Sequence, residues 1–318
     1  MRNHPHFKAY LALAAVCFFW GTTYLGIRMA LEAMPPAALI SLRYIISGTV
    51  LLIVSFLAKA RLPAGKDLLL TALFGVIIIG IGNGCLAFAE LWVPSGLAAL
   101  FITTSPFWMI GLEAAIPGGE RLHGPTLLGM MVGLAGTLLL VAPSAMQGFS
   151  GPLMKGFLVL QVGCAGWSFG SILQRRHQSK IHPVVSGAVQ QLATGVAFLG
   201  PALLTKTEPI HWTFRGAAAI AYLTLFGSII GYSAYIYVLD KLPVSVVSIY
   251  NYVNPVVAVT LGWLFYREHI GLREFAAMLI VFAGVALVKR ASRVTRKRQT
   301  PAGPLPASLD VDEPHTAV

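Results

Sequence analysis

Long runs of apolar residues, separated by short stretches rich in proline, glycine or charge, dominate this chain. The runs cover residues 9–30, 37–58, 67–91, 95–116, 124–142, 153–173, 183–204, 215–238, 243–265 and 270–288. A helix that crosses the hydrocarbon of a bilayer needs about 20 apolar residues, and most of these runs have that length. The pattern therefore predicts an all-α integral membrane protein with ten transmembrane helices.

The composition supports the same class of protein. Hydrophobic residues make up 56% of the 318 positions and charged residues 11%, whereas an average soluble domain is about 25% charged. A single soluble core of this length could not hide so much apolar surface. The first run is too long for the hydrophobic part of a signal peptide and has no clear cleavage site, so we predict a permanent first helix.

The basic residues indicate how the helices are oriented. If the N-terminus is cytoplasmic and ten helices alternate, 16 of the 23 Lys and Arg residues fall on the cytoplasmic side and six on the other, with Arg43 inside a helix. Lys and Arg are enriched in cytoplasmic loops. We therefore expect a multi-pass protein of the bacterial inner (plasma) membrane with both termini in the cytoplasm. An odd number of helices would put the basic run at 289–298 outside.

The two halves of the chain resemble each other. At an offset of 147 residues Trp20 falls on Trp167, and at an offset of 149 Pro94 falls on Pro243. Five helices in each half is an odd number, so the second half would enter the membrane in the opposite direction. The prediction is therefore two inverted five-helix repeats, an arrangement found in many secondary transporters.

These repeats set the expected domain organisation. We assign residues 1–145 to the first repeat, 146–290 to the second, and 291–318 to a cytoplasmic tail that is basic and then disordered. The basic residues suit attachment of the tail to an anionic membrane surface. We expect no nucleic-acid partner, because the positive charge follows membrane topology and does not form a binding groove.

Enzymatic motifs are not convincing in this sequence. Cys17, Cys85 and Cys164 lie inside apolar runs without the spacing of metal ligands, so packing is the better interpretation. The Gly-x-Ser-x-Gly pattern at 166–170 also lies inside an apolar run, whereas a hydrolase needs it on a strand–turn–helix elbow. No Walker motif is evident. We therefore predict a protein that is not an enzyme and that uses no metal or other cofactor.

Arg43 and Glu90 are the charged residues most relevant to function. Arg43 lies within the second apolar run and Glu90 near the end of the third. A charge at that depth costs roughly 2.5–3.5 kcal/mol on insertion scales and needs a partner or a water-filled cavity. Arg43 could bind a substrate carboxylate, gate the outer mouth with Glu90, or form a purely structural ion pair with it. Glu113, near the end of its run, is expected to reach the surface or line an inner vestibule.

Pro106 and Pro255 occupy matching positions in the two halves. A proline inside a helix removes a backbone donor and frees a carbonyl, and paired interruptions in two repeats are a pointer to a transporter's binding region. We therefore predict helix breaks with a gating role there, with Ser105 and Asn254 facing a cavity. The alternative is a kink that only shapes packing.

Other polar and aromatic side chains within the apolar runs complete the predicted cavity. A buried amide is costly in lipid unless it is satisfied, so amides should face the interior of the bundle. For any one aromatic residue, packing or a place in the interfacial belt is the alternative. The predicted substrate-binding residues, beyond those named above, are Trp20, Tyr24, Asn83, Trp108, Trp167, Gln190, Tyr232, Tyr235 and Asn251.

Several local motifs together resemble the EamA-type permeases of the drug/metabolite transporter superfamily. The resemblance extends from about Leu11 to Val288. Its motifs are Trp20-Gly21-Thr22-Thr23-Tyr24, Pro35-Pro36 with Arg43, Gly82-Asn83-Gly84 with Glu90, residues 93–99, residues 166–171, residues 226–230 and residues 252–258. The resemblance implies a ten-helix carrier with a central cavity, which in this family often exports amino acids or other metabolites.

From these observations we expect a secondary transporter that exports small organic solutes, such as amino acids or related metabolites, by alternating access. The alternatives are an efflux carrier of amphipathic drug-like compounds and a passive facilitator or channel. The expected partners are the small-molecule substrate and the lipid bilayer, with the protein a monomer or weak homodimer. Protons are a candidate coupling ion, because Glu90 and Glu113 could titrate, but a facilitator needs neither.

Overall fold

The structure is a computed structural model that describes residues 7–119, 124–146, 151–177, 181–204, 210–266 and 271–299. These residues form helices and short connections and contain no strand, which confirms the all-helical prediction. The elements are α1 (Phe7–Leu31), α2 (Pro36–Leu57), α3 (Gly65–Gly75), η1 (Val76–Ile81), α4 (Gly82–Ala89), α5 (Ser95–Ile102), α6 (Ser105–Ala115), α7 (Gly124–Met146), α8 (Gly151–His177), α9 (Pro183–Leu204), α10 (Phe214–Tyr222), η2 (Leu223–Tyr232), α11 (Ser233–Lys241), α12 (Val244–Val247), α13 (Tyr250–Tyr266) and α14 (Leu272–Gln299).

Seven helical segments among the described residues are long and apolar enough to cross a membrane. Shorter apolar stretches lie in α7 and α14. Since a spanning segment needs about 20 apolar residues, the protein is a multi-pass membrane protein. The seven segments are Phe7–Leu31, Pro36–Leu57, Gly65–Ala89, Ser95–Ala115, Gly151–His177, Pro183–Leu204 and Phe214–Lys241.

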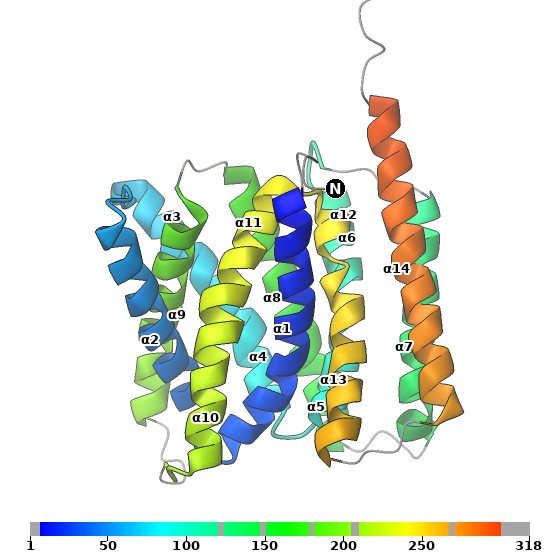
Figure 1. Cartoon of the computed structure of the whole chain (residues 1–318), viewed down its shortest axis with the longest axis horizontal. Helices are drawn as coiled ribbons and strands as arrows, with labels where there is room; N and C mark the ends of the chain where they lie inside the picture. The colour runs from blue at the N-terminus through cyan, green and yellow to red at the C-terminus, as the bar shows by residue number, and fades with distance from the viewer. Residues whose placement is uncertain are drawn as a thin grey trace, which may run out of the picture.

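The helices run side by side between two ends of the molecule (Figure 1). We call the end that holds the start of α1 the upper end, and the end that holds the turn from Glu90 to Pro94 the lower end. The last turns of α14 lie at the upper end, as does the start of α1 (Figure 1). Helix α14 continues to Gln299, so the backbone of residues 291–299 is helical, and residues 300–318 lie outside the described residues.

Helices α1 and α8 form the centre of the bundle. Helix α1 packs on α10, η2, α11 and α13, and α8 packs on η1, α4 and α6. Val16 and Ile27 of α1 and Leu160 and Ile172 of α8 are fully buried. Two further helix pairs, α2 with α9 and α7 with α14, make the most extensive contacts. Each of these two pairs joins a helix from the first half of the chain to one from the second half.

Glycines allow α2 and α9 to approach closely. A Cβ atom added at Gly48 would lie 2.7 Å from the backbone nitrogen of Leu192, and one added at Gly195 would lie 2.7 Å from the backbone nitrogen of Ile45. The Ser41 hydroxyl donates a hydrogen bond of 2.9 Å to the Gly195 carbonyl across the same interface. Small residues at helix contacts let backbones pack and bond in this way inside a membrane.

The helices that follow α2 and α9 both change to wider π-helical turns. These are η1, which starts at Val76, and η2, which starts at Leu223. The two starts are 147 positions apart, the offset that also relates Trp20 to Trp167. A π-helical turn shifts the side chains that follow it around the helix axis and is frequent at functional sites. The two segments therefore mark matching places in the two halves.

We predict that Gly195→Ala destabilises the protein and that Gly200→Ala does not. The methyl group at position 195 would meet the α2 backbone, whereas a Cβ at Gly200 of the same helix has open space around it. Overpacking of this kind costs about 1–3 kcal/mol. Thermal unfolding of the detergent-purified variants measures the difference. Equal stability of the two variants would contradict the close packing of α2 on α9.

Candidate functional site

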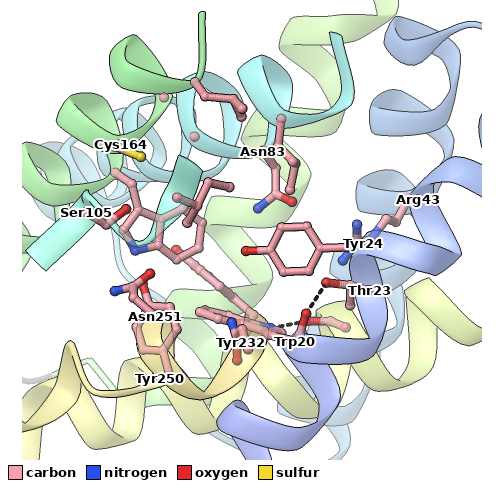
Figure 2. A pocket seen from close by; sticks show the side chains of 18 of the residues that line it. Trp20, Thr23, Tyr24, Arg43, Asn83, Ser105, Cys164, Tyr232, Tyr250 and Asn251 are labelled. Carbon is pink, nitrogen blue, oxygen red and sulfur yellow. Dashed lines mark hydrogen bonds between the residues drawn. The ribbon is translucent and has the colours of Figure 1, made fainter. Parts of the chain in front are cut away.

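A central cavity lies where the two halves of the chain meet. Its empty volume is about 670 Å³, mouth included. Figure 2 shows aromatic, amide and hydroxyl side chains from several helices that converge on it. Its lining residues are Trp20, Thr23, Tyr24, Arg43, Tyr44, Gly82, Asn83, Leu86, Ile102, Ser105, Leu160, Gly163, Cys164, Trp167, Gly227, Tyr232, Tyr250, Asn251 and Asn254.

Two tryptophans meet at the centre of this cavity wall. The ring centroids of Trp20 and Trp167 are 5.2 Å apart, with the ring planes 88° apart. Each ring also packs on a glycine of the other half, because a Cβ at Gly231 would lie 2.6 Å from Trp20 and a Cβ at Gly82 would lie 2.6 Å from Trp167. The glycines therefore create the space in which both indoles fit.

Hydrogen bonds and further rings hold the tryptophans in place. Trp20 Nε1 donates to the Gly227 carbonyl at 3.0 Å, and Trp167 Nε1 donates to the Tyr235 hydroxyl at 3.0 Å. The Tyr235 ring lies 5.0 Å from that of Trp20, and the Tyr250 ring 5.1 Å. Edge-to-face and tilted aromatic contacts at this spacing are favourable. The result is a rigid aromatic wall in which Tyr235 lies behind the lining residues.

Arg43 is the only charged residue among the described side chains that line the cavity. Its Nε donates to the Ser228 hydroxyl at 2.7 Å, and the Ser228 carbonyl in turn accepts a bond of 3.2 Å from Gln191 Nε2. Ser47 donates to the Gln191 side-chain oxygen. A Cβ at Gly227 would lie 2.6 Å from the Arg43 guanidinium. The polar network and the glycine thus fix a buried guanidinium at the cavity wall.

Neutral polar groups lie on the other side of the cavity from Arg43. Figure 2 shows Ser105, Cys164 and Asn251 there. The Asn251 amide nitrogen donates to the Ser248 carbonyl at 3.2 Å, but its Oδ1 atom is buried without a partner among the described residues. Buried acceptors normally have a hydrogen bond, so this oxygen is available to accept one from a polar group. The cavity therefore has a cationic side and an acceptor side.

A second cavity lies nearer the upper end, and its lining includes Gln174, His177, His182, Ser186 and Asp240. A short hydrogen-bonded chain separates it from the central cavity. The Tyr232 hydroxyl of the central cavity donates to Gln190 Oε1. Gln190 Nε2 donates at 3.0 Å to Gln174 Oε1 and at 3.0 Å to the Ser186 hydroxyl. Tyr232 and Gln190 therefore close the central cavity toward the second one.

Glu90 does not pair with Arg43. It lines a third cavity at the lower end with Arg28, Glu32 and Trp92, and neither carboxylate oxygen has a hydrogen-bond partner among the described residues. The pairing considered from the sequence is therefore not formed. The reason is that Arg43 turns toward η2, where Ser228 receives its bond.

Most of the predicted substrate-binding residues line the central cavity, and four do not. Glu90 lies in the third cavity, Gln190 lies behind Tyr232, and Tyr235 lies behind Trp167. Trp108 is 39% exposed and bonds Gln161 at 3.0 Å, so its ring lies away from the cavity. The residues that do line it are Trp20, Tyr24, Arg43, Asn83, Ser105, Trp167, Tyr232, Asn251 and Asn254.

The two prolines occupy different places in their helices. Pro106 stands in the first turn of α6, directly after the break at Thr103 and Thr104, whereas Pro255 lies inside α13. Helix α12 ends before α13 begins, so a break also precedes Pro255. Both breaks lie close to cavity-lining residues, which are Ser105 in the first case and Tyr250, Asn251 and Asn254 in the second.

Sequence reasoning missed several lining residues. Leu160, Gly163 and Cys164 line the cavity together with Trp167. They lie seven, four and three positions before Trp167, which is the spacing of residues on one helix face. The prediction that Trp167 lines the cavity could therefore have identified them. Cys164 was interpreted as a packing residue. Ser228, the partner of Arg43, lies in the 226–230 motif, but its role depends on a contact between distant segments that the sequence does not display.

Glu113, which was expected near the surface or an inner vestibule, lies 3.3 Å from Arg176 as an ion pair. Among the described residues, no group of three or more His, Cys, Asp or Glu side chains is placed to hold a metal ion.

Comparison with known proteins gives one family. The EamA-like transporter family matches the chain twice, over residues 7–142 and 154–290. An Escherichia coli K12 protein named "Uncharacterized inner membrane transporter YedA" is 32% identical over 290 residues, which are 91% of this chain and 92% of that protein. A Bacillus subtilis protein named "Uncharacterized transporter YoaV" is 22% identical, over 87% of this chain and 95% of its own.

A solved crystal structure has the same fold. It matches with a TM-score of 0.74 at 23% sequence identity and covers 90% of this chain and 98% of its own. The double family match and the similarity to YedA both extend over nearly all the helical part of the chain. The chain therefore belongs to the EamA-like transporter family of the drug/metabolite transporter superfamily and is a membrane transporter.

Proposed function

We propose that the protein is a secondary carrier that exports small organic solutes, such as amino acids or related metabolites, from the cytoplasm by alternating access. The observation that carries the proposal is the central cavity, which combines one buried arginine, aromatic walls and an unpaired amide oxygen between the two halves of the chain. In this proposal ten helices form two inverted repeats, and the upper end faces the cytoplasm.

Contacts related by a near-constant offset support the inverted repeat. The contact between Gly48 and Leu192 corresponds to the contact between Gly195 and Ile45. Gly195 lies 147 positions after Gly48, and Leu192 lies 147 positions after Ile45. The two tryptophans pack on glycines of the opposite half in the same reciprocal way, with the tryptophans 147 and the glycines 149 positions apart, and the two family matches are related by offsets of 147 and 148. Such a molecule has two related conformations, one open to each side of the membrane.

The partition between the two cavities supports alternating access. Tyr232 and Gln190 separate the central cavity from the second cavity near the upper end. The bonds in this partition join side chains of η2, α8 and α9, which are separate elements of the second half. Breaking a few hydrogen bonds would therefore connect the two cavities without unfolding a helix.

The charges of the central cavity favour a solute that carries a carboxylate. The Arg43 guanidinium still has donors beyond the one bonded to Ser228, and arginine binds carboxylates through paired donors. The Asn251 oxygen offers an acceptor for an amino group on the other side. A cationic drug-like compound would meet the charge of Arg43 with no acidic residue among the described lining residues to offset it. This favours amino acids over the efflux of such compounds.

We predict that Arg43→Ala abolishes or strongly weakens saturable uptake of amino acids into proteoliposomes. Loss of a charge-assisted hydrogen bond costs about 1.5–3 kcal/mol, equivalent to roughly a 10- to 100-fold rise in KM. The matched control is Arg61→Ala, which removes an exposed arginine between α2 and α3. A panel of labelled amino acids, assayed with and without a pH gradient, provides the measurement.

The outcomes separate the proposed carrier from its alternatives. If uptake shows counterflow, and if Arg43→Ala impairs it while Arg61→Ala does not, the result supports a carrier in which Arg43 contacts the substrate. Uptake without counterflow indicates a facilitator or channel. Failure of well-folded protein to move any amino acid would contradict the proposed substrate class and favour other metabolites or drug-like compounds.

The native Cys164 provides a test of alternating access. It lines the central cavity but is only 4% exposed, so we expect a membrane-impermeant thiol reagent to label it slowly in a variant that lacks Cys17 and Cys85. Adding Gln190→Ala breaks the bonds to Tyr232, Gln174 and Ser186, so labelling from the upper end should increase.

The comparison requires vesicles of both orientations. Asp240→Asn in the same cysteine background is the control, because Asp240 lines the second cavity but is not part of the hydrogen-bonded partition. If Cys164 is labelled equally from the upper end in the Gln190→Ala variant and in its parent, the partition does not act as a gate.

A further inference from the structure

Glu90 is a buried acid without a partner. It directly follows the Gly65–Ala89 span, caps the C-terminus of α4 and is 6% exposed. Both carboxylate oxygens are buried, and neither has a hydrogen-bond partner among the described residues. The central cavity does not include Glu90, so the proposed substrate site does not explain it.

The surroundings of Glu90 supply charge but no direct partner. Arg28 of α1 and Glu32, which directly follows α1, line the same cavity, and the Arg28 charge acts on Glu90 through space. Glu32 faces Arg215 of α10 at 3.8 Å. Lys155 of α8 lies over the Trp92 ring at 4.1 Å. Tyr24, which lines the central cavity, interacts electrostatically with Glu90 from α1. Among the described residues, Arg28 and Tyr24 therefore act on Glu90 through space and Glu32 shares its cavity, whereas Arg215 and Lys155 contact Glu32 and Trp92.

Two other acids among the described residues, Glu113 and Asp240, have basic partners. Glu113 is also buried but pairs with Arg176 at 3.3 Å. Asp240 occupies nearly the equivalent turn of the second half, where it is exposed and lies 2.7 Å from Lys241. Both acids therefore lie beside a basic side chain. Glu90 has no such partner among the described residues.

A buried carboxylate in this position is more stable when it is protonated. Moving an unpaired charge out of water is strongly unfavourable, and such groups usually shift their pKa and become neutral instead. Burial raises the pKa of the Glu90 carboxyl well above its usual range, and the nearby Arg28 charge opposes this effect only in part. The acid therefore binds a proton while it is buried and releases it when water reaches it.

We propose that the Glu90 carboxyl is the proton-binding site through which the carrier couples solute movement to a proton gradient. The inference rests on the proposed function as a carrier. The carboxylate takes up one proton from the aqueous phase at the lower end and becomes a neutral acid. The same proton leaves, and the carboxylate forms again, when the central cavity is open to the upper end and water reaches Glu90 past Tyr24.

The position of Glu90 in the chain links its protonation to the cavity. Glu90 begins the turn that joins α4 to α5. Helix α4 carries Asn83 and Leu86 of the cavity lining, and α5 carries Ile102. A change in the charge and hydration of this turn therefore acts on two elements that contact the solute. Proton binding and solute binding would then influence each other through α4 and α5.

The protonation state can be tested without a known solute. We expect infrared spectra of purified wild-type protein at neutral pH to contain the C=O band of a protonated carboxylic acid, and we expect Glu90→Gln to remove that band. Asp240→Asn is the control and should leave it unchanged. Absence of the band from wild type, or its persistence in Glu90→Gln, would overturn the proposal.

Coupling is tested in proteoliposomes with the amino acids that the wild-type protein transports. We expect an imposed pH gradient to accelerate wild-type transport, and we expect Glu90→Gln to lose this acceleration while it retains counterflow exchange. Acceleration that survives in Glu90→Gln would overturn the coupling role. If no amino acid moves, the proposed function fails, and the infrared result still decides whether Glu90 holds a proton.

Discussion

The close contact between the two halves of the chain is the constraint on which the rest of the structure depends. Trp20 and Trp167 meet edge to face, and each fits only because a glycine of the other half leaves room for it. The α2–α9 interface depends on Gly48 and Gly195 in the same way. In a bilayer, where lipid is as apolar as leucine, close packing and hydrogen bonds must hold helices together. The central cavity is the space that this packing leaves.

The burial of charge divides the interior into functionally different places. Arg43 bonds Ser228 beside the aromatic wall, so hydrogen bonding offsets part of the free-energy cost of burying its charge. The guanidinium keeps further N–H donors for a ligand. Glu113 is neutralised by Arg176 near the upper end. Glu90 has no such partner. A solute anion would compensate the first group and a proton the third, so the two proposed ligands have separate sites linked by α4 and α5.

The cavities also explain why the carrier can remain closed on one side. Tyr232 and Gln190 form a polar partition that is fully buried, and a buried polar network is stable only while every member is satisfied. Water or a solute entering from the second cavity could replace those bonds with bonds of its own. The partition therefore combines a well-defined closed state with a modest cost of opening.

The sequence by itself determined the membrane class, most helix positions to within a few residues, the repeat offset and nine of the 19 residues that line the central cavity. Apolar length, amides within apolar runs and paired motifs such as Trp20 and Trp167 are local properties that a single chain displays. The tertiary structure decided that Arg43 bonds Ser228, that Glu90 is unpaired in a separate cavity, and that Tyr235 and Gln190 lie behind the lining. These outcomes depend on how helices distant in sequence turn toward one another, and helical periodicity does not encode that rotation.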